Sequence, residues 1–169
     1  LLAGAWLGRM AAVVAITADR GLAGAYNSAI IRTTERLISD YESRGIEVML
    51  VTSGKKAQSY FRYRGRQAET FTGFSERPTF GDARRVAAVV MAAFEEGSVD
   101  TVSVVYTRFL SLGSQQVATR QLIPLQQEDL EDPSGTGTIV YDFEPDPEAI
   151  VDRLLPSWVE AELLVALLE

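Results

Sequence analysis

The sequence predicts an α/β domain in which a mostly parallel sheet lies between two layers of helices. Apolar runs short enough to be buried strands alternate along the chain with longer stretches whose apolar residues recur at helical spacing. The first of these runs is almost wholly apolar, as expected for a strand covered on both faces. This alternation is typical of a three-layer, Rossmann-like fold, because parallel neighbours are joined by helical crossovers.

The first half of the chain alternates strands and helices. Ile30, Leu37 and Tyr41 recur at helical spacing, and Gly45 suits the residue just after a helix end, because glycine adopts a left-handed backbone without strain. A second apolar run follows, and a second helix opens at Gly54. The expected elements are strands 11–17 and 46–52 and helices 27–44 and 54–64, and residues 66–74 are compatible with a third short strand.

The second half begins with a clear helix start. Thr79 is expected to be the N-cap, Asp82 to complete a capping box three residues later, and Gly97 to end the helix. A valine-rich strand follows, and the strand after it is polar enough for a sheet edge or an antiparallel partner. The expected elements are helix 79–96, strands 99–106 and 116–125 with a bend at 112–114, a surface loop at 128–137 and a short extended piece at 139–143.

The last helix carries two start signals. Asp146 is placed as its N-cap and Pro147 as its first residue, where a missing N–H is harmless. Pro156 is expected to interrupt the helix, and Ser157 with Glu160 to restart it as a second capping box. Beyond the restart, apolar residues fall on more than one side, which is too apolar for an exposed helix. This helix therefore either buries in the domain or packs along another helix.

Composition excludes several kinds of chemistry. The 169 residues contain neither Cys nor His, so disulfides, thiolate catalysis, thiolate metal ligands and the commonest general base are absent. No apolar run reaches the roughly 18 residues of a membrane-spanning helix. Residues 1–10 lack the basic region and the cleavage pattern of a signal peptide. A hydrophobic fraction of 47% and a charged fraction of 23% are those of one globular domain.

The net charge of −7 is unevenly distributed. From Gln121 onward there are twelve acids and one base, a balance of −11, whereas the preceding residues carry eleven acids and fifteen bases, a balance of +4. An acidic chain without a long basic stripe is not expected to bind nucleic acid. A smaller basic cluster is either a solvated helix face or a patch for an acidic partner. It consists of Lys55, Lys56, Arg62, Arg64 and Arg66.

The turn after the first strand also invites a nucleotide-binding interpretation. Gly21 and Gly24 stand between a strand and a helix, but the dinucleotide fingerprint needs three glycines, and the phosphate-loop pattern fails at Gly54-Lys55-Lys56. The alternative is that these glycines let the strand and the helix pack closely. Asp19 and Arg20 stand where an active-site pair would sit, and they equally suit an ion pair that fixes the turn or a contact with a neighbouring subunit.

Two long motifs carry a resemblance to a known family. Residues 16–32, ITADRGLAGAYNSAIIR, read Thr-x-Asp-Arg-Gly-Leu-x-Gly-x-x-Asn and lead into a helix. This run resembles the signature near the start of the globular domain of the gamma subunit of F-type ATP synthase, the central stalk of that rotary enzyme. The tail, residues 141–169, resembles the family's entry into its C-terminal helix. Gly73-Phe74-Ser75 and the strand at 102–106 fall between them in the expected order.

The resemblance implies a non-catalytic subunit with no cofactor and no metal of its own. The implied partners are the ring of catalytic alpha and beta subunits, the epsilon subunit and the membrane rotor ring, on the cytoplasmic face of a bacterial plasma membrane and without insertion into it. Proton flow turns the membrane ring, the ring turns the shaft, and the asymmetric shaft drives the catalytic subunits through their binding states. The alternative function is a small nucleotide-binding α/β enzyme that uses the turn at Asp19–Gly24.

Under this resemblance the chain divides into an unplaced segment at 1–10, a Rossmann-like domain at 11–145 and the start of the coiled-coil shaft helix at 146–169. The family's long helical arms are missing at both ends, so the sequence is interpreted as a fragment. The residues expected to form a structural turn are Asp19, Arg20, Gly21, Gly24 and Asn27. The candidate subunit contacts are Lys55, Lys56, Arg62, Trp158, Leu164 and Leu168.

Overall fold

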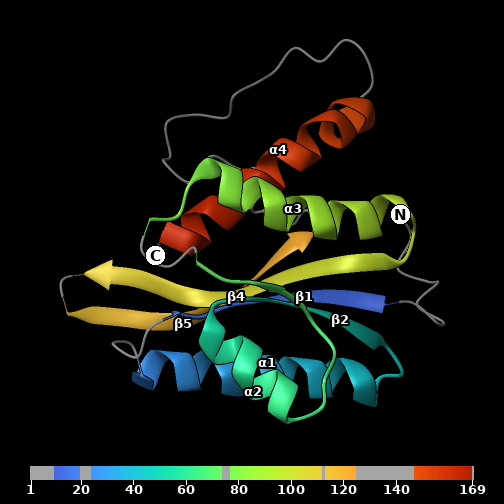
Figure 1. The fold of residues 1–169 in the computed structure, drawn as a ribbon. Helices are drawn as coiled ribbons and strands as arrows, with labels where there is room; N and C mark the ends of the chain where they lie inside the picture. Colours follow the sequence, from blue (N-terminus) through green and yellow to red (C-terminus); the bar gives the residue numbers. More distant parts are fainter. Residues whose placement is uncertain (1–9, 20–23, 74–76, 112, 125–146, 169) are drawn as a thin grey trace.

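The computed structural model describes residues 10–19, 24–73, 77–111, 113–124 and 147–168, and it contains one five-stranded sheet (Figure 1). The strands lie in the order β3-β2-β1-β4-β5. Their bounds are β1 (Met10–Ile16), β2 (Glu47–Ser53), β3 (Glu69–Phe71), β4 (Val99–Ser111) and β5 (Ser114–Ile123). β1 is parallel to β2 and β4, β2 is parallel to β3, and β5 is antiparallel to β4. The predicted mostly parallel sheet is confirmed.

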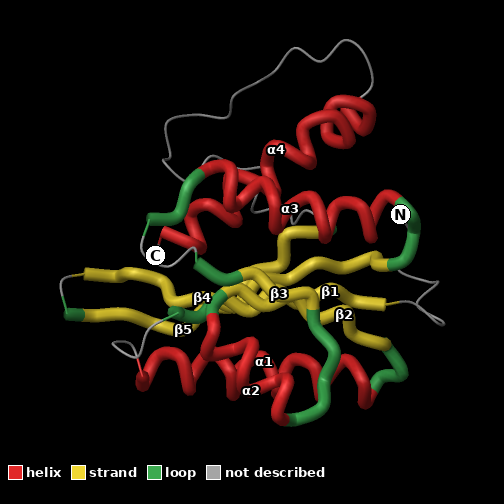
Figure 2. The backbone as a smooth tube through the Cα atoms, viewed as in Figure 1, coloured by secondary structure: helices red, strands yellow, loops and turns green. Residues whose placement is uncertain are grey.

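Two helices cover each face of the sheet. The helices are α1 (Gly24–Ser43), α2 (Lys55–Tyr63), α3 (Phe80–Glu95) and α4 (Pro147–Leu168). Figure 1 shows α1 and α2 below the sheet and α3 and α4 above it, and Figure 2 shows the same three layers. The strand order reverses beside β1. The chain first adds β2 and β3 on one edge of β1 and then, through α3, adds β4 on the opposite edge of β1. The predicted three-layer fold is therefore confirmed.

Successive residues of β1 contribute to two separate apolar cores, because the side chains of a strand alternate between its faces. Ala11, Val13 and Ala15 belong to the core beside α1 and α2. Ala12 and Val14 belong to the core beside α3 and α4. All five side chains are at most 1% exposed. Burial on both faces explains why this strand is a continuous apolar run.

Local signals set the ends of two helices. The Thr79 side chain accepts a hydrogen bond from Asp82 N at 3.2 Å, and Asp82 Oδ2 accepts one from Thr79 N at 2.9 Å, so the predicted capping box of α3 is confirmed. Gly45, with a φ of +76°, follows α1 as predicted. α1 begins at Gly24, about one turn before the predicted start at residue 27, so Asn27 lies inside the helix.

β4 is five residues longer than the predicted strand at 99–106, for a physical reason. Residues 107–111 are partly or fully exposed and pair with β5 in an antiparallel hairpin around Gly113, whose φ is +83°. A backbone ladder needs no apolar pattern, so hydrophobic periodicity does not reveal this extension. Phe109 and Leu110 are 49% and 52% exposed in it. The antiparallel partner predicted for the polar strand is confirmed.

The prediction that Pro156 interrupts the last helix is wrong. α4 is continuous with Pro156 inside it, and Ser157 lies within the helix instead of capping a new one. Proline removes one backbone hydrogen bond and crowds the preceding turn. Tertiary packing compensates here, because Leu155 and Val159 on either side are 7% and 0% exposed in the core. Pro147 is the first helical residue as predicted. The expected loop at 128–137, the extended piece at 139–143 and Asp146 lie outside the described residues.

Candidate functional site

The carboxyl end of β1 caps the start of α2. The first N–H groups of a helix have no partner inside it, and Gly54 at the N-cap has no side chain that can accept from them. The segment after β1 supplies three acceptors instead. The bonds run from Lys55 N to Asp19 Oδ1 at 3.0 Å, from Lys56 N to Ala18 O at 3.4 Å and from Ala57 N to Thr17 Oγ1 at 3.0 Å. One segment thereby fixes a helix that lies more than thirty residues further along the chain.

Asp19 also holds a third segment of the domain. Its Oδ2 accepts a hydrogen bond from Gly73 N, 2.8 Å away, in the loop after β3. One carboxylate therefore joins the ends of three neighbouring strands through two charge-assisted bonds. The role of Asp19 in a structural turn stays a prediction, which these two hydrogen bonds support. Arg20 and Gly21 lie outside the described residues, so their part in the turn stays a prediction.

The start of α2 lies close to the segment after β1, and this close approach depends on Gly54. Its φ of +104° and ψ of +143° lie in a region where a side chain is strained. A Cβ at this position would overlap the carbonyl oxygen of Thr17 and lie 2.6 Å from Thr17 Oγ1. Close packing of this kind was expected at Gly21 or Gly24. The close contact that the structure describes is at Gly54, whereas the surroundings of Gly21 and of Gly24, the first residue of α1, are not described, so close packing there stays a prediction.

Asn27 reaches the same turn from α1. Its Oδ1 accepts a hydrogen bond from Ala18 N at 3.0 Å, and the residue is 5% exposed. Within the described residues, its Nδ2 has no hydrogen-bond partner. Asn27 and Asp19 thus both bind backbone groups around the end of β1, and their part in a structural turn stays a prediction.

Replacing Thr17 by valine is expected to lower the free energy of unfolding by about 2 kcal/mol, because the buried Ala57 N–H loses its acceptor. Valine keeps the shape of the side chain, so the loss reports the hydroxyl group. Urea unfolding followed by circular dichroism measures it. The matched control is Thr119→Val, at an exposed position of β5, which should change stability by less than about 0.5 kcal/mol. Equal midpoints for the two variants would contradict the capping role.

A small cavity lies where the strand order reverses. Thr17 and Asn27, Thr107 of β4 and Leu167 in the last turn of α4 are among its lining residues, and its volume is about 220 Å³. Nucleotides bind at this position in open α/β sheets. However, this cavity is smaller than the roughly 300–1,000 Å³ of small-molecule sites. Among the described residues that line it there is no Lys or Arg. The described lining of this cavity therefore offers no cation for a phosphate group, whereas residues 20–23 of the turn that the enzyme interpretation uses lie outside the described residues.

Calorimetric titration of the chain with millimolar Mg-ATP, and separately with NAD, is expected to show no saturable heat of binding. Helix N-termini bind phosphate through free N–H groups, and the first three of α2 already bond to Thr17, Ala18 and Asp19. Injection of each nucleotide into buffer gives the reference heat. A saturable heat with a micromolar dissociation constant would restore the enzyme interpretation.

The predicted basic cluster does not gather at one place. Lys55 and Lys56 lie in the first turn of α2 and Arg62 in its last turn, and all three are exposed. Arg64 and Arg66, beyond the helix, form ion pairs with glutamates of α1. Sequence reasoning missed the arginines of α1 that face this segment, although their four-residue spacing was visible. A subunit contact at Lys55, Lys56 or Arg62 stays a prediction.

α4 has two apolar faces. The face toward the domain is at most 7% exposed and belongs to the same core as α3 and the sheet. It carries Leu155, Val159, Leu163 and Ala166. The nearly opposite face is exposed and carries Leu154, Ala161, Val165 and Leu168. Of the predicted subunit contacts on this helix, Trp158 and Leu164 are partly buried against the domain core, whereas Leu168 is 61% exposed. A role of these three residues as subunit contacts stays a prediction.

Charged residues of the domain flank α4. Arg120 of β5 pairs with Glu162 at 3.1 Å, and its guanidinium lies 5.8 Å from the centre of the Trp158 ring. Arg84 of α3 lies 3.8 Å from Glu160. Ion pairs that are this exposed contribute little to stability. The buried apolar face therefore provides most of the attachment.

In the part of the chain that the structure describes, no three acidic side chains come close enough together to hold a metal ion. The described helices are each too short or too polar to cross a bilayer. The best-formed constellation is a capping network at the end of β1, and the last helix leaves one apolar face open. These features define a three-layer α/β domain whose last helix packs on the sheet layer with one face and exposes the other.

Comparison with known proteins places the chain in one family. A family model described as ATP synthase matches residues 5–169. ATP synthase gamma chains from Parafrankia sp. (strain EAN1pec) and Frankia casuarinae are 42% and 44% identical over 165 residues. Each alignment covers 94% of this chain and 55% of the relative, so the chain spans about half the length of the curated relatives it matches. The chain belongs to this ATP synthase family.

Solved structures agree with this fold. A chain of the central stalk and c-ring of the Tetrahymena thermophila mitochondrial ATP synthase matches with a TM-score of 0.66 and 22% identity, over 95% of this chain and 69% of that chain. A rotor chain of the Euglena gracilis mitochondrial ATP synthase matches with a TM-score of 0.60 and 21% identity, over 94% and 60%. At these identities, the comparison concerns the three-layer fold alone.

Proposed function

We propose that this chain is the globular part of a gamma subunit, the central stalk of a proton-translocating F-type ATP synthase, and that it has no active site of its own. The family match and the gamma-chain relatives support this assignment. The proposed partners are the catalytic alpha and beta subunits, the epsilon subunit and the membrane rotor ring. The proposed location is peripheral, on the cytoplasmic face of a bacterial plasma membrane, within that complex.

The observation that carries the proposal is the pair of apolar faces on α4. A rotating shaft transmits torque only if its helix is fixed to the domain at its foot. Val159 and Leu163 are 0% exposed, and a fully buried side chain of this kind stabilises by roughly 1.5–3 kcal/mol. The domain therefore holds α4 firmly enough for the two to turn together.

The exposed face of α4 is suited to a second helix. Leu154, Ala161, Val165 and Leu168 are seven, four and three residues apart, which is the spacing of coiled-coil core positions. An exposed apolar row at this spacing marks an interaction surface. The proposed occupant is the other helical arm of the shaft. In this arrangement the domain turns α4, and α4 turns the coiled coil inside the catalytic ring.

A chimaeric enzyme tests the proposed function. Residues 11–168 of this chain replace the matching region of the Frankia casuarinae gamma chain, and ATP-driven proton pumping is measured in inverted membrane vesicles. We expect the chimaera to assemble and to pump. A chimaera that assembles in normal amount but hydrolyses ATP without pumping would contradict the proposal.

A pair of substitutions in that chimaera examines the open face of α4. Val165→Glu places a charge in the proposed coiled-coil seam, so we expect it to lower pumping strongly. Gln67→Glu adds the same charge at an exposed position far along the chain, before β3, and should leave pumping unchanged. Full pumping by the Val165→Glu enzyme would show that this face does not form the shaft.

A further inference from the structure

A charged groove lies between α1 and the segment that ends α2. Its volume is about 510 Å³, and its floor contains Ile38 and Phe61, which are 2% and 1% exposed. The walls carry charged side chains of both signs, with cations in excess. They are Arg32, Arg36, Arg64 and Arg66, together with Glu35 and Glu42. The groove is therefore a defined concave surface with a net positive charge.

The two glutamates of the groove are already engaged. Glu35 accepts a hydrogen bond from the Tyr60 hydroxyl at 2.7 Å and lies 3.8 Å from Arg64 Nε. The hydrogen bond to this carboxylate, with a smaller effect of burial, raises the pKa of Tyr60. Glu42 pairs with Arg66 Nη1 at 3.0 Å. Both carboxylates are thus held toward α2 and the residues that follow it.

The other two arginines lack such compensation. Within the described residues, no ion pair or hydrogen bond reaches Arg32 or Arg36, and both are exposed. They are one helical turn apart on α1, where side chains are neighbours and like charges oppose each other. An anion that binds from outside relieves this repulsion. The chain as a whole carries a net charge of −7, so the excess of positive charge in the groove is opposite in sign to the net charge of the chain.

We propose that this groove docks an acidic polypeptide segment of a partner, with two carboxylates one helical turn apart that pair with Arg32 and Arg36. Guanidinium groups bind carboxylates through paired hydrogen bonds, which gives geometric specificity. The groove follows residues 32–42 of α1, about 15 Å at the helical rise, which matches two to three turns of a bound helix.

The two engaged glutamates distinguish this partner from other anions. A compact polyanion such as a phosphate cluster fills the groove with charge and meets Glu35 and Glu42, whereas carboxylates spaced along a peptide avoid them. The occupant is therefore a protein segment. Docking here uses only the layer of α1 and α2, so it is separate from the shaft role proposed for α4.

The test uses a helical peptide with an acetylated N-terminus and an amidated C-terminus. The peptide is rich in alanine and glutamine and has two glutamates four residues apart. The control peptide has glutamine at both positions. Backbone amide chemical shifts of the isotope-labelled full chain are followed during each titration at low salt. We expect saturable shifts around Arg32 and Arg36 with the glutamate peptide and about tenfold weaker binding of the control. The double variant Arg32→Gln/Arg36→Gln should weaken binding of the glutamate peptide by about the same factor, and added salt should weaken it further.

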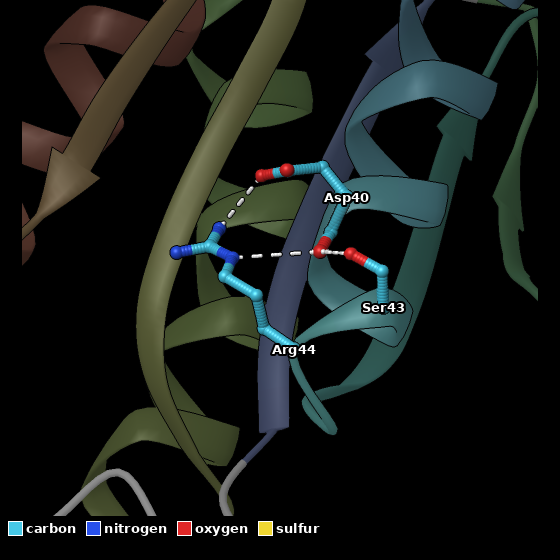
Figure 3. Close-up of polar contacts among 3 residues, drawn as sticks. All are labelled: Asp40, Ser43 and Arg44. Atoms are coloured by element: carbon cyan, nitrogen blue, oxygen red, sulfur yellow. Dashed lines mark hydrogen bonds and ion pairs between the residues drawn. The ribbon is translucent and has the colours of Figure 1, made fainter.

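Arg44 provides the matched control on the same helix layer. Its Nη2 pairs with Asp40 Oδ2 at 2.8 Å, and its Nε donates to Asp40 O at 3.4 Å (Figure 3). Ser43 Oγ donates to the same carbonyl at 2.7 Å. Because its charge is already compensated and it is not among the groove residues, Arg44→Gln should leave the affinity within about twofold.

A charge swap strengthens the test. The variant Arg32→Glu/Arg36→Glu should lose the glutamate peptide and bind a peptide with lysine at the same two positions. Thermal melts by circular dichroism establish that each variant is folded. Equal affinity of the original chain for the glutamate and glutamine peptides, or unchanged affinity in the double glutamine variant, would overturn the proposal. Tighter binding of inorganic phosphate or of phosphatidylglycerol vesicles at the same amides would also overturn it.

Discussion

Replacing Gly54 by alanine is expected to lower the free energy of unfolding by about 3 kcal/mol or more. A residue with a side chain held at this backbone conformation is strained by roughly 1–3 kcal/mol. The new Cβ also overlaps the Thr17 carbonyl oxygen, and forcing extra atoms into a packed site costs roughly 1–3 kcal/mol. Relief of the overlap moves Thr17 away from α2, so the capping network is weakened as well.

Urea midpoints for the Gly54 variant and one matched glycine variant measure this effect. Gly65 also has a positive φ, +73°, but nothing lies within 4 Å of the position where its Cβ would be. Gly65→Ala therefore carries only the backbone penalty of roughly 1–2 kcal/mol. Equal losses for the two variants would show that the contact with Thr17 has no consequence, and the account of this edge would be wrong.

The elements that sequence reasoning located best are those whose signals are local. The Thr79–Asp82 capping box lies within four residues, and Gly45 and Gly97 mark helix ends through their own backbone freedom. The continuous apolar run of β1 reflects burial on two faces, which is a property of each residue in turn. These signals can be interpreted without knowing which distant segments of the chain are in contact.

The features that sequence reasoning missed depend on segments that are distant in the chain. Thr17, Ala18 and Asp19 cap a helix across the sheet, so the need for a glycine at residue 54 follows from that contact and from no neighbouring residue. Sequence reasoning assigned close packing to Gly21 and Gly24, which stays a prediction, and did not single out Gly54 for it. The hairpin extension of β4 was missed because its backbone ladder forms without an apolar pattern.

Residues on α1 and α4 illustrate the same division. Sequence reasoning did not single out Arg32 and Arg36, because their place in a groove depends on the packing of α1 beside α2. For α4, the excess of apolar residues correctly indicated that the helix is not exposed on all sides. Sequence reasoning left open whether the helix buries in the domain or packs elsewhere, and only the fold assigns one face to the domain.

Replacing Leu163 by alanine is expected to lower the free energy of unfolding by about 3 kcal/mol, whereas Leu168→Ala should change it by less than about 0.5 kcal/mol. The two substitutions remove the same atoms from the same helix. Leu163 is 0% exposed in the core shared by α3, α4 and the sheet, so its loss leaves a cavity there. Leu168 is 61% exposed on the open face, so its loss leaves the domain core intact.

Urea unfolding of the two leucine variants of this chain measures that difference directly, and pumping by the chimaeric enzyme gives the complementary readout. The stability cost should fall on Leu163→Ala in the isolated chain. Leu168→Ala should act mainly in the assembled enzyme, where we propose that its face meets the second shaft helix. Small and equal losses in the isolated chain would mean that α4 is not part of the domain core. In that case the globular domain would not hold α4 in place, and the proposed transmission of torque through Val159 and Leu163 would have to be abandoned.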